Sequence, residues 1–138
     1  LSVRDYVDLG EWRSRVGSVL ADFSDRSPAA VAQRHRAAVE RLDPVAMAAD
    51  YALNAVLERP GAHYESWYAI ADYFDSVPSR LAGRELAFGS MEAIGSDRVR
   101  LSWRISKGID AAVSGEDTFQ IVAGRIAHQV TTLSEGDF

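Results

Sequence analysis

Residues 98–106, RVRLSWRIS, alternate between polar and apolar side chains without a break. Val99, Leu101, Trp103 and Ile105 fall on one face of an extended chain, and the polar residues between them fall on the other. A period of two is typical of a β-strand with one face in a protein core and the other in solvent. The stretch therefore predicts one strand of a half-buried antiparallel sheet.

The segments on either side predict more strands of the same sheet. They are runs of mixed apolar and polar residues separated by short turns that contain glycine. The expected strands cover residues 84–94, 112–122 and 125–133, with turns at Gly95 to Asp97, Gly108 to Asp110 and Gly124. Four strands joined in this way form a meander.

The first half of the chain predicts helices, because its apolar residues recur every three or four positions. The expected helices cover Asp8 to Phe23, Pro28 to Leu42, Pro44 to Asp50 and Ala62 to Phe74, with Pro78 stopping the last and a short strand over 51–59. Ser27-Pro28 and Asp43-Pro44 are typical helix starts. Helices followed by a meander predict an α+β fold, here a single domain over residues 1–138.

The first of these helices carries an apolar stripe on one face. It consists of Trp12, Val16, Val19, Leu20 and Phe23. Burial of large apolar side chains is favourable, so we expect this helix to pack through that stripe, on an open end of its own domain or on a neighbouring subunit, rather than to trail free.

The composition excludes several function classes. The chain has 138 residues and a net charge of −5, with no run of basic residues, which argues against nucleic acid or an anionic membrane as a partner. It has no cysteine, so disulfides, thiol catalysis and cysteine-ligated zinc are excluded. The lack of cysteine also favours a cytoplasmic protein. No cofactor is expected.

The stretch GEDTFQI at residues 115–121, followed by Gly124-Arg125-Ile126, resembles the closing hairpin of NTF2-like domains. The SnoaL-like branch of that superfamily, with polyketide cyclases and ketosteroid isomerases, is the most similar. The resemblance covers residues 29–134 and leaves residues 1–26 as an added N-terminal helix. It implies a cone-shaped half barrel, in which helices pack on a curved antiparallel sheet around an apolar cavity, and frequent homodimers.

Asp117 is the first candidate for a catalytic group. It shares a strand face with Phe119 and Ile121, and a carboxylate on an apolar face has a raised pKa, which suits an acid or a hydrogen-bond donor. The resemblance places Asp117 on the buried acid of ketosteroid isomerase. The alternative is an aspartate at a strand start that accepts backbone hydrogen bonds near Gly115.

His35 is the second candidate, since it lies on the inner face of a predicted helix. The resemblance places it at the isomerase's catalytic tyrosine, and a neutral imidazole can donate a hydrogen bond or carry a proton. The alternative is a histidine with satisfied hydrogen bonds between helix and sheet. Arg59 takes the position of the isomerase's base, and arginine cannot abstract a proton. The steroid isomerase mechanism is therefore not carried over, and Arg59 either binds an anionic group or is a solvated strand end.

Aromatic residues on the same faces could bind a flat hydrophobic ligand, or could be plain core. The ligand-binding candidates are Tyr51, Arg59, Tyr64, Trp67, Tyr68, Trp103 and Phe119. His63 and His128 are too scattered to join His35 in a metal site, so no metal is predicted.

These observations predict a pocket for a small, largely apolar, carbonyl-containing molecule. If the protein is an enzyme, it is expected to be a cofactor-independent cyclase, isomerase or dehydratase that uses acid–base chemistry, with Asp117 and His35 as the reacting groups. The alternative is a non-catalytic ligand-binding or dimerisation module, which the arginine at position 59 favours.

We predict a homodimer formed through the outer face of the sheet. The row Arg98, Arg100, Ser102 and Arg104 is polar and could pair with acidic groups across a two-fold axis. Analytical ultracentrifugation at micromolar concentration should show a species of twice the 15.1 kDa chain mass. A 15.1 kDa species under those conditions would rule the dimer out.

Overall fold

The computed structural model describes residues 9–106 and 113–135, so the turn expected at Gly108 to Asp110 lies outside the described residues. The helices are α2 (Leu9–Leu20), α3 (Pro28–Glu40), α4 (Pro44–Ala49) and α5 (Ser66–Leu81). The strands are β1 (Tyr51–Arg59), β2 (Ala62–Glu65), β3 (Glu85–Ala93), β4 (Arg98–Ser106), β5 (Val113–Val122) and β6 (Arg125–Glu135). Among the helices in these ranges, none combines the length and apolar character that a bilayer crossing requires.

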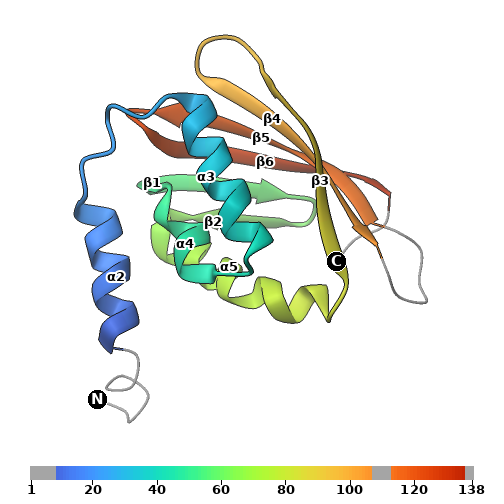
Figure 1. Ribbon diagram of the computed structural model, residues 1–138, viewed down its shortest axis with the longest axis horizontal. Helices are drawn as coiled ribbons and strands as arrows, with labels where there is room; N and C mark the ends of the chain where they lie inside the picture. The colour runs from blue at the N-terminus through green and yellow to red at the C-terminus, as the bar shows by residue number, and fades with distance from the viewer. Residues whose placement is uncertain (1–8, 107–112, 136–138) are drawn as a thin grey trace.

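The six strands form one curved sheet in the order β2-β1-β6-β5-β4-β3. Strands β3 to β6 form the predicted antiparallel meander. The expectation of a wholly antiparallel sheet is wrong, because β1 pairs with β6 in parallel and the sheet is mixed. A parallel pair needs a long connection, and α5 and three strands of the meander supply it. Figure 1 shows α3, α4 and α5 gathered on one side of the curved sheet.

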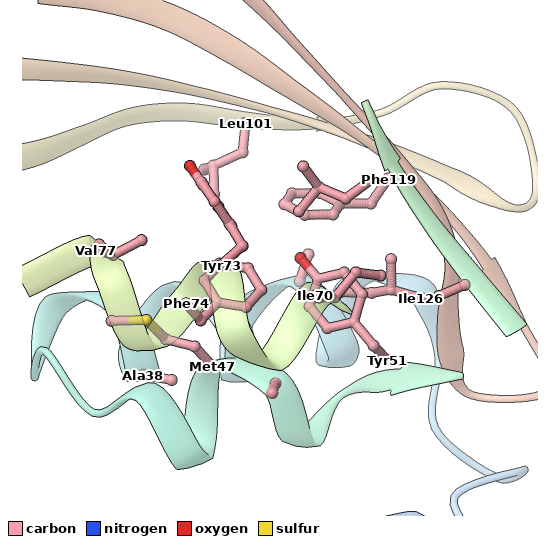
Figure 2. Packing of buried hydrophobic residues seen from close by; sticks show 14 of the residues in the cluster. Ala38, Met47, Tyr51, Ile70, Tyr73, Phe74, Val77, Leu101, Phe119 and Ile126 are labelled. Atoms are coloured by element: carbon pink, nitrogen blue, oxygen red, sulfur yellow. The ribbon is translucent and has the colours of Figure 1, made fainter. Parts of the chain in front are cut away.

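The core lies between these helices and the inner face of the sheet. The predicted inner row of β4 is buried, with Val99, Leu101, Trp103 and Ile105 all at most 5% exposed. Phe119 on β5 and Ile126 on β6 extend that apolar face, and α5 packs against it (Figure 2). The period of two in residues 98–106 thus predicted the buried face correctly.

Helices α3 and α4 begin where their sequence signals predict. The Ser27 hydroxyl accepts a hydrogen bond from the Ala30 N–H, and the Asp43 carboxylate accepts one from the Ala46 N–H. Each cap is followed by a proline at the start of the helix. These caps satisfy amide groups that have no partner within the helix, and so they fix where α3 enters the core.

The helix expected over Ala62 to Phe74 begins and ends later than predicted. Residues 62–65 form β2, which returns along β1 after a turn at Gly61, and α5 then runs from Ser66 to Leu81. Pro78 lies inside α5 and does not stop it. Proline lacks only its own N–H, and the buried Val77 and Leu81 on either side hold the last turn against the core.

Helix α2 exists, but its apolar stripe does not face the domain as predicted. Trp12, Val16 and Leu20 are 50%, 37% and 77% exposed, and Val19 packs partly against the core. The buried residue of α2 is Arg15, whose guanidinium reaches the carboxylate of Asp75 on α5 at 2.7 Å. The inward face of α2 therefore carries Arg15 and its ion pair with Asp75, and most of the stripe lies on the exposed side.

The end of α2 is held by the guanidinium of Arg125 at the start of β6. Its Nη2 donates to the backbone carbonyls of Ser18, Val19 and Ala21, at 2.6, 3.2 and 2.7 Å. Cations are favourable at the C-terminal end of a helix, where carbonyl groups lack partners. Arg125 thereby ties the N-terminal segment to the sheet.

The outer face of the sheet carries the expected polar row, and part of that row is paired within the chain. Arg100 donates to Glu92 at 2.9 Å and lies 3.6 Å from Glu116. Arg100 thus has acidic partners on its own sheet, and the dimer through this face stays a prediction.

We predict that Gly124→Ala destabilises the protein more than Gly61→Ala. Both glycines have a positive φ, +74° and +76°, but a Cβ at Gly124 would lie 1.7 Å from the Phe23 carbonyl oxygen, whereas the space around Gly61 is open. Gly61→Ala should cost about 1 kcal/mol of backbone strain, and Gly124→Ala should cost a further ~1–3 kcal/mol for the clash. Urea unfolding of both variants measures the difference. Equal costs would show that the Phe23 segment does not pack on this turn.

Candidate functional site

A small hollow of about 40 Å³ lies between the inner face of the sheet and helices α3 and α5. Its polar lining consists of His35, Tyr73, Trp103, Asp117, Gln129 and Thr131. Apolar side chains from α3, α5 and β3 complete it, among them Val39, Phe74 and Phe88. At roughly 10–15 Å³ for each water, it has room for about three water molecules. The hollow thus holds a dense set of polar groups in an apolar surround.

Asp117 places its carboxylate in this hollow from the middle of β5. Loss of water around the carboxylate is the main influence and raises the pKa of Asp117 to about 6. Hydrogen bonds with Thr131, Trp103 and Gln129, together with the charge of Arg59, act in the opposite direction on this pKa. Because desolvation outweighs them, Asp117 is a carboxyl group that exchanges its proton near neutral pH.

A chain of hydrogen bonds leads to Asp117 along the sheet. The Tyr51 hydroxyl donates to Gln129 Oε1, and Gln129 Nε2 donates to Thr131 Oγ1 at 3.2 Å. Thr131 Oγ1 in turn donates to Asp117 Oδ1 at 2.7 Å. Each donor points toward the carboxylate, so the chain fixes its position and one of its oxygens is occupied.

His35 faces the hollow from α3 and is buried. Its Nδ1 lies 3.1 Å from the carbonyl oxygen of Met47, and a carbonyl can only accept, so Nδ1 carries the hydrogen. Burial lowers the pKa of His35, with the charge of Asp50 acting against it. The ring is therefore neutral at pH 7, and its Nε2 is a hydrogen-bond acceptor.

Arg59 and Tyr73 form a buried pair at another wall of the hollow. Arg59 is 7% exposed, and its Nη1 donates to the Tyr73 hydroxyl at 2.8 Å. Tyr73 lines the hollow, and the ring of Tyr64 packs on it with centroids 4.9 Å apart. The arginine at the end of β1 is thus part of the surroundings of the site and not a solvated strand end.

Comparison with solved structures identifies the architecture. An NTF2-like protein from Burkholderia thailandensis is 24% identical with a TM-score of 0.67, covering 79% of this chain and 92% of that one. A candidate polyketide cyclase from Sinorhizobium meliloti is 22% identical with a TM-score of 0.62, covering 73% and 92%. A candidate ketosteroid isomerase from Kribbella flavida is 15% identical with a TM-score of 0.68, covering 80% of each chain. The protein has an NTF2-like fold. Scans against family models and against curated protein sequences give no match.

Within this NTF2-like fold, the structure brings some of the expected site residues together and leaves others apart. His35, Trp103 and Asp117 line the hollow. Tyr51 joins through the hydrogen-bond chain, and Arg59 joins through Tyr73. These five residues come from α3 and from three strands of the sheet, so the fold is what unites them.

The other aromatic candidates lie outside the lining. Trp67 is buried and donates from Nε1 to the Ala48 carbonyl at 3.0 Å, which is a structural contact. Tyr68 is 62% exposed. Phe119 is fully buried behind the edge of the His35 ring, with centroids 5.4 Å apart. Of these residues, Phe119 is the one that touches a lining group of the NTF2-like hollow.

Three polar lining residues were not among the expected site residues. Thr131 and Gln129 lie two positions apart on β6 and so share a strand face, which was the available signal. Nothing in the sequence set Tyr73 apart from the other aromatic residues of α5. Its part in the site depends on a contact with Arg59, fourteen positions earlier in the chain.

The remaining histidines lie away from the hollow, on the strands at one side of the sheet. His128 Nε2 is 2.6 Å from the carboxylate of Glu58, and His63 Nε2 is 2.9 Å from that of Glu65. Within residues 9–106 and 113–135, no three acidic or histidine side chains are arranged to hold a metal ion.

We predict that Asp117→Asn changes the pH dependence of stability. The folded pKa of about 6 exceeds the ordinary 3.8, so the folded state favours the protonated acid. That contribution is fully present below pH 4 and is lost as the pH rises through 6. Between pH 4 and pH 8 the variant should therefore gain on the order of 2–3 kcal/mol relative to the unchanged protein.

Urea unfolding at several pH values measures this difference. Glu116→Gln is the matched control, because it removes a carboxylate from the outer face of the same strand. If Asp117→Asn instead loses stability relative to the unchanged protein as the pH rises, Asp117 is a structural acceptor of hydrogen bonds.

Proposed function

We propose that this protein binds a small, largely apolar carbonyl compound in the hollow and transfers a proton on it. The observation that carries the proposal is the Asp117 carboxyl group, desolvated, held by Thr131 and given a pKa of about 6. Apolar side chains such as Phe74, Phe88 and Val39 surround it. A fixed titratable group in an apolar hollow is the arrangement that general acid–base catalysis needs.

The pKa of Asp117 suits both directions of proton transfer. With a value of about 6, roughly nine in ten of these groups are ionised at pH 7 and can act as a base. The acid formed after proton uptake is strong enough to return the proton. Hydrogen bonds with Thr131, Trp103 and Gln129 hold the carboxyl group in place for this transfer.

The step is enolisation. The Asp117 carboxylate takes a proton from the carbon next to the carbonyl, and the electron pair of that C–H bond forms a carbon–carbon double bond. The electron pair of the carbonyl double bond moves onto oxygen and gives an enolate. If the enolate is conjugated with a second double bond, return of the proton from Asp117 to the far carbon isomerises the compound. If the enolate carbon attacks a second carbonyl group, a ring closes and the alkoxide that forms takes the proton from Asp117. If the carbon β to the carbonyl carries a hydroxyl group, that group takes the proton from Asp117 and leaves as water, which dehydrates the compound.

His35 supplies a second acceptor in the same hollow. Its Nδ1 hydrogen is engaged by the Met47 carbonyl, and the neutral ring leaves Nε2 with a lone pair. An acceptor of this kind can orient a hydroxyl group on the ligand while Asp117 acts on carbon. On this proposal, His35 makes the site favour a carbonyl compound that carries a hydroxyl group over one that does not.

Two structural neighbours have names that fit the proposed reaction class. One is named as a candidate polyketide cyclase and another as a candidate ketosteroid isomerase, and both names imply reactions of carbonyl compounds. Their identities of 22% and 15% establish a shared fold, and the activity rests on the site itself.

The second candidate function is a non-catalytic binding module, which the arginine at position 59 favours because it cannot act as a base. For either function, the size of the hollow limits the ligand. A cavity of ~150 Å³ accommodates benzene, whereas this hollow has about 40 Å³. A ring-shaped ligand enters only if side chains at its edge, such as Phe88 and Leu86 on β3, move aside. A module that only binds would hold a ligand without moving its protons.

Hydrogen–deuterium exchange on carbon separates the two functions. Cyclohexanone in D2O loses its α-hydrogen NMR signal as the base acts, and the protein should accelerate this loss above the buffer rate. Asp117→Asn should reduce the acceleration by at least about 100-fold, the usual contribution of a general base. Glu116→Gln, on the outer face, should leave it unchanged.

Each outcome of this exchange experiment has one meaning. Binding of cyclohexanone without accelerated exchange would support the binding module and refute the catalytic proposal. Accelerated exchange that survives Asp117→Asn would assign the base to another residue.

A further inference from the structure

We infer that Tyr73, oriented by Arg59, donates the hydrogen bond that receives the carbonyl oxygen of the ligand. The inference rests on the proposed function and adds the electrophilic half of the site. A base alone does not enolise a ketone efficiently, because negative charge develops on oxygen and needs a donor aimed at it. The hollow contains Asp117 as the base, and Tyr73 is the lining residue that carries a hydroxyl on the helical wall.

The position of Tyr73 fits this role. It lies on α5 and lines the same hollow as Asp117, which lies on β5 of the sheet. Figure 2 shows its side chain extending from α5 toward Leu101, with the hydroxyl oxygen at the far end. The negative charge of Asp117 raises the pKa of Tyr73, which places the two groups within electrostatic reach of each other. A ligand between them can meet the carboxylate with its carbon and the hydroxyl with its oxygen.

The direction of the Arg59 hydrogen bond determines what Tyr73 can do. A guanidinium only donates, so the Tyr73 oxygen accepts from Arg59 Nη1 at 2.8 Å. The hydroxyl hydrogen of Tyr73 is therefore available to a second acceptor. A carbonyl oxygen in the hollow is such an acceptor.

Burial keeps Tyr73 protonated, and the positive charges around it strengthen it as a hydrogen-bond donor. Burial is the largest influence and raises the pKa of Tyr73. The guanidinium carbons of Arg59 and Arg80 lie 5.6 and 5.3 Å from the ring centroid. Positive charge at that distance polarises the phenol without removing its proton. Tyr73 thus meets the oxygen as a neutral, polarised donor, and Arg59 acts through it as a positioning residue.

The sequence did not predict this role of Arg59, which is to orient the Tyr73 hydroxyl. Arginine at the end of β1 cannot serve as a base, but it can hold a tyrosine at the opposite wall of the hollow. The base is then Asp117 on β5, and the donor is Tyr73 on α5. The two halves of the reaction come from the sheet and from the helix that covers it.

Infrared spectroscopy of bound ketone tests the inference directly. The carbonyl stretch of 13C-carbonyl cyclohexanone moves to lower frequency when its oxygen accepts a hydrogen bond. Bound to the unchanged protein, the band should lie below its position in an apolar solvent. Tyr73→Phe should return it toward that position and slow α-hydrogen exchange about 100-fold, the usual effect of losing one donor to an oxyanion.

Asp117→Asn is the matched control for this measurement. It should reduce the acceleration of α-hydrogen exchange at least about 100-fold and keep the shifted band, because it removes the base and leaves the donor in place. Arg59→Lys retains the positive charge without the planar fork and should reduce the band shift without abolishing it. Thermal melting followed by circular dichroism verifies that each variant is folded. If Tyr73→Phe does not fold, the band shift in Arg59→Lys provides the test instead.

The outcomes separate this inference from the proposed function. A shifted band that is unchanged in Tyr73→Phe, or in Arg59→Lys if that variant is used instead, would overturn the inference and leave the proposed function intact. No binding of cyclohexanone to the unchanged protein would overturn both. Loss of exchange in Asp117→Asn together with loss of the band shift in Tyr73→Phe would support both.

Discussion

The hydrogen bond from Thr131 to Asp117 joins the fold of this protein to its chemistry. A carboxylate placed among apolar side chains is costly, and the hydroxyl at 2.7 Å compensates for part of that cost. Desolvation still outweighs the hydrogen bonds, which is why the pKa of Asp117 is raised to about 6. The desolvation that makes the folded state less stable also gives Asp117 a proton that it can exchange near neutral pH.

The mixed sheet is what makes this balance possible. Parallel pairing of β1 with β6 sets Tyr51 opposite Ile126, from where its hydroxyl reaches Gln129. The hydrogen-bond chain from Tyr51 to Asp117 therefore runs across three strands. Helix α5 then covers the inner face and brings Tyr73 to the hollow, and β1 ends at Arg59, which holds it. Each polar group is thus fixed by a different element, and no short segment of the chain contains the site.

Sequence analysis predicted what local patterns determine. The alternation in residues 98–106 gave the buried face of β4, and the alternation on β5 placed Asp117 with Phe119 on the face turned to the helices. The sequence did not predict the long-range contacts. The pair of Arg59 and Tyr73 joins separate elements, β1 joins β6 from the far end of the chain, and the ion pair of Arg15 with Asp75 turned the stripe of α2 outward. In each case the structure depends on a contact between residues that are far apart in the sequence, and the local pattern carries no information about such a contact.

The central claim is that Asp117 is a desolvated acid and not a structural acceptor, and its own titration tests that claim most directly. In protein labelled with 13C at the aspartate carboxyl carbon, the Asp117 resonance is assigned by its absence from the Asp117→Asn spectrum. Its midpoint should lie near pH 6. A midpoint at or below the ordinary value of 3.8 would contradict the account, because the carboxylate would then be held ionised by its hydrogen bonds.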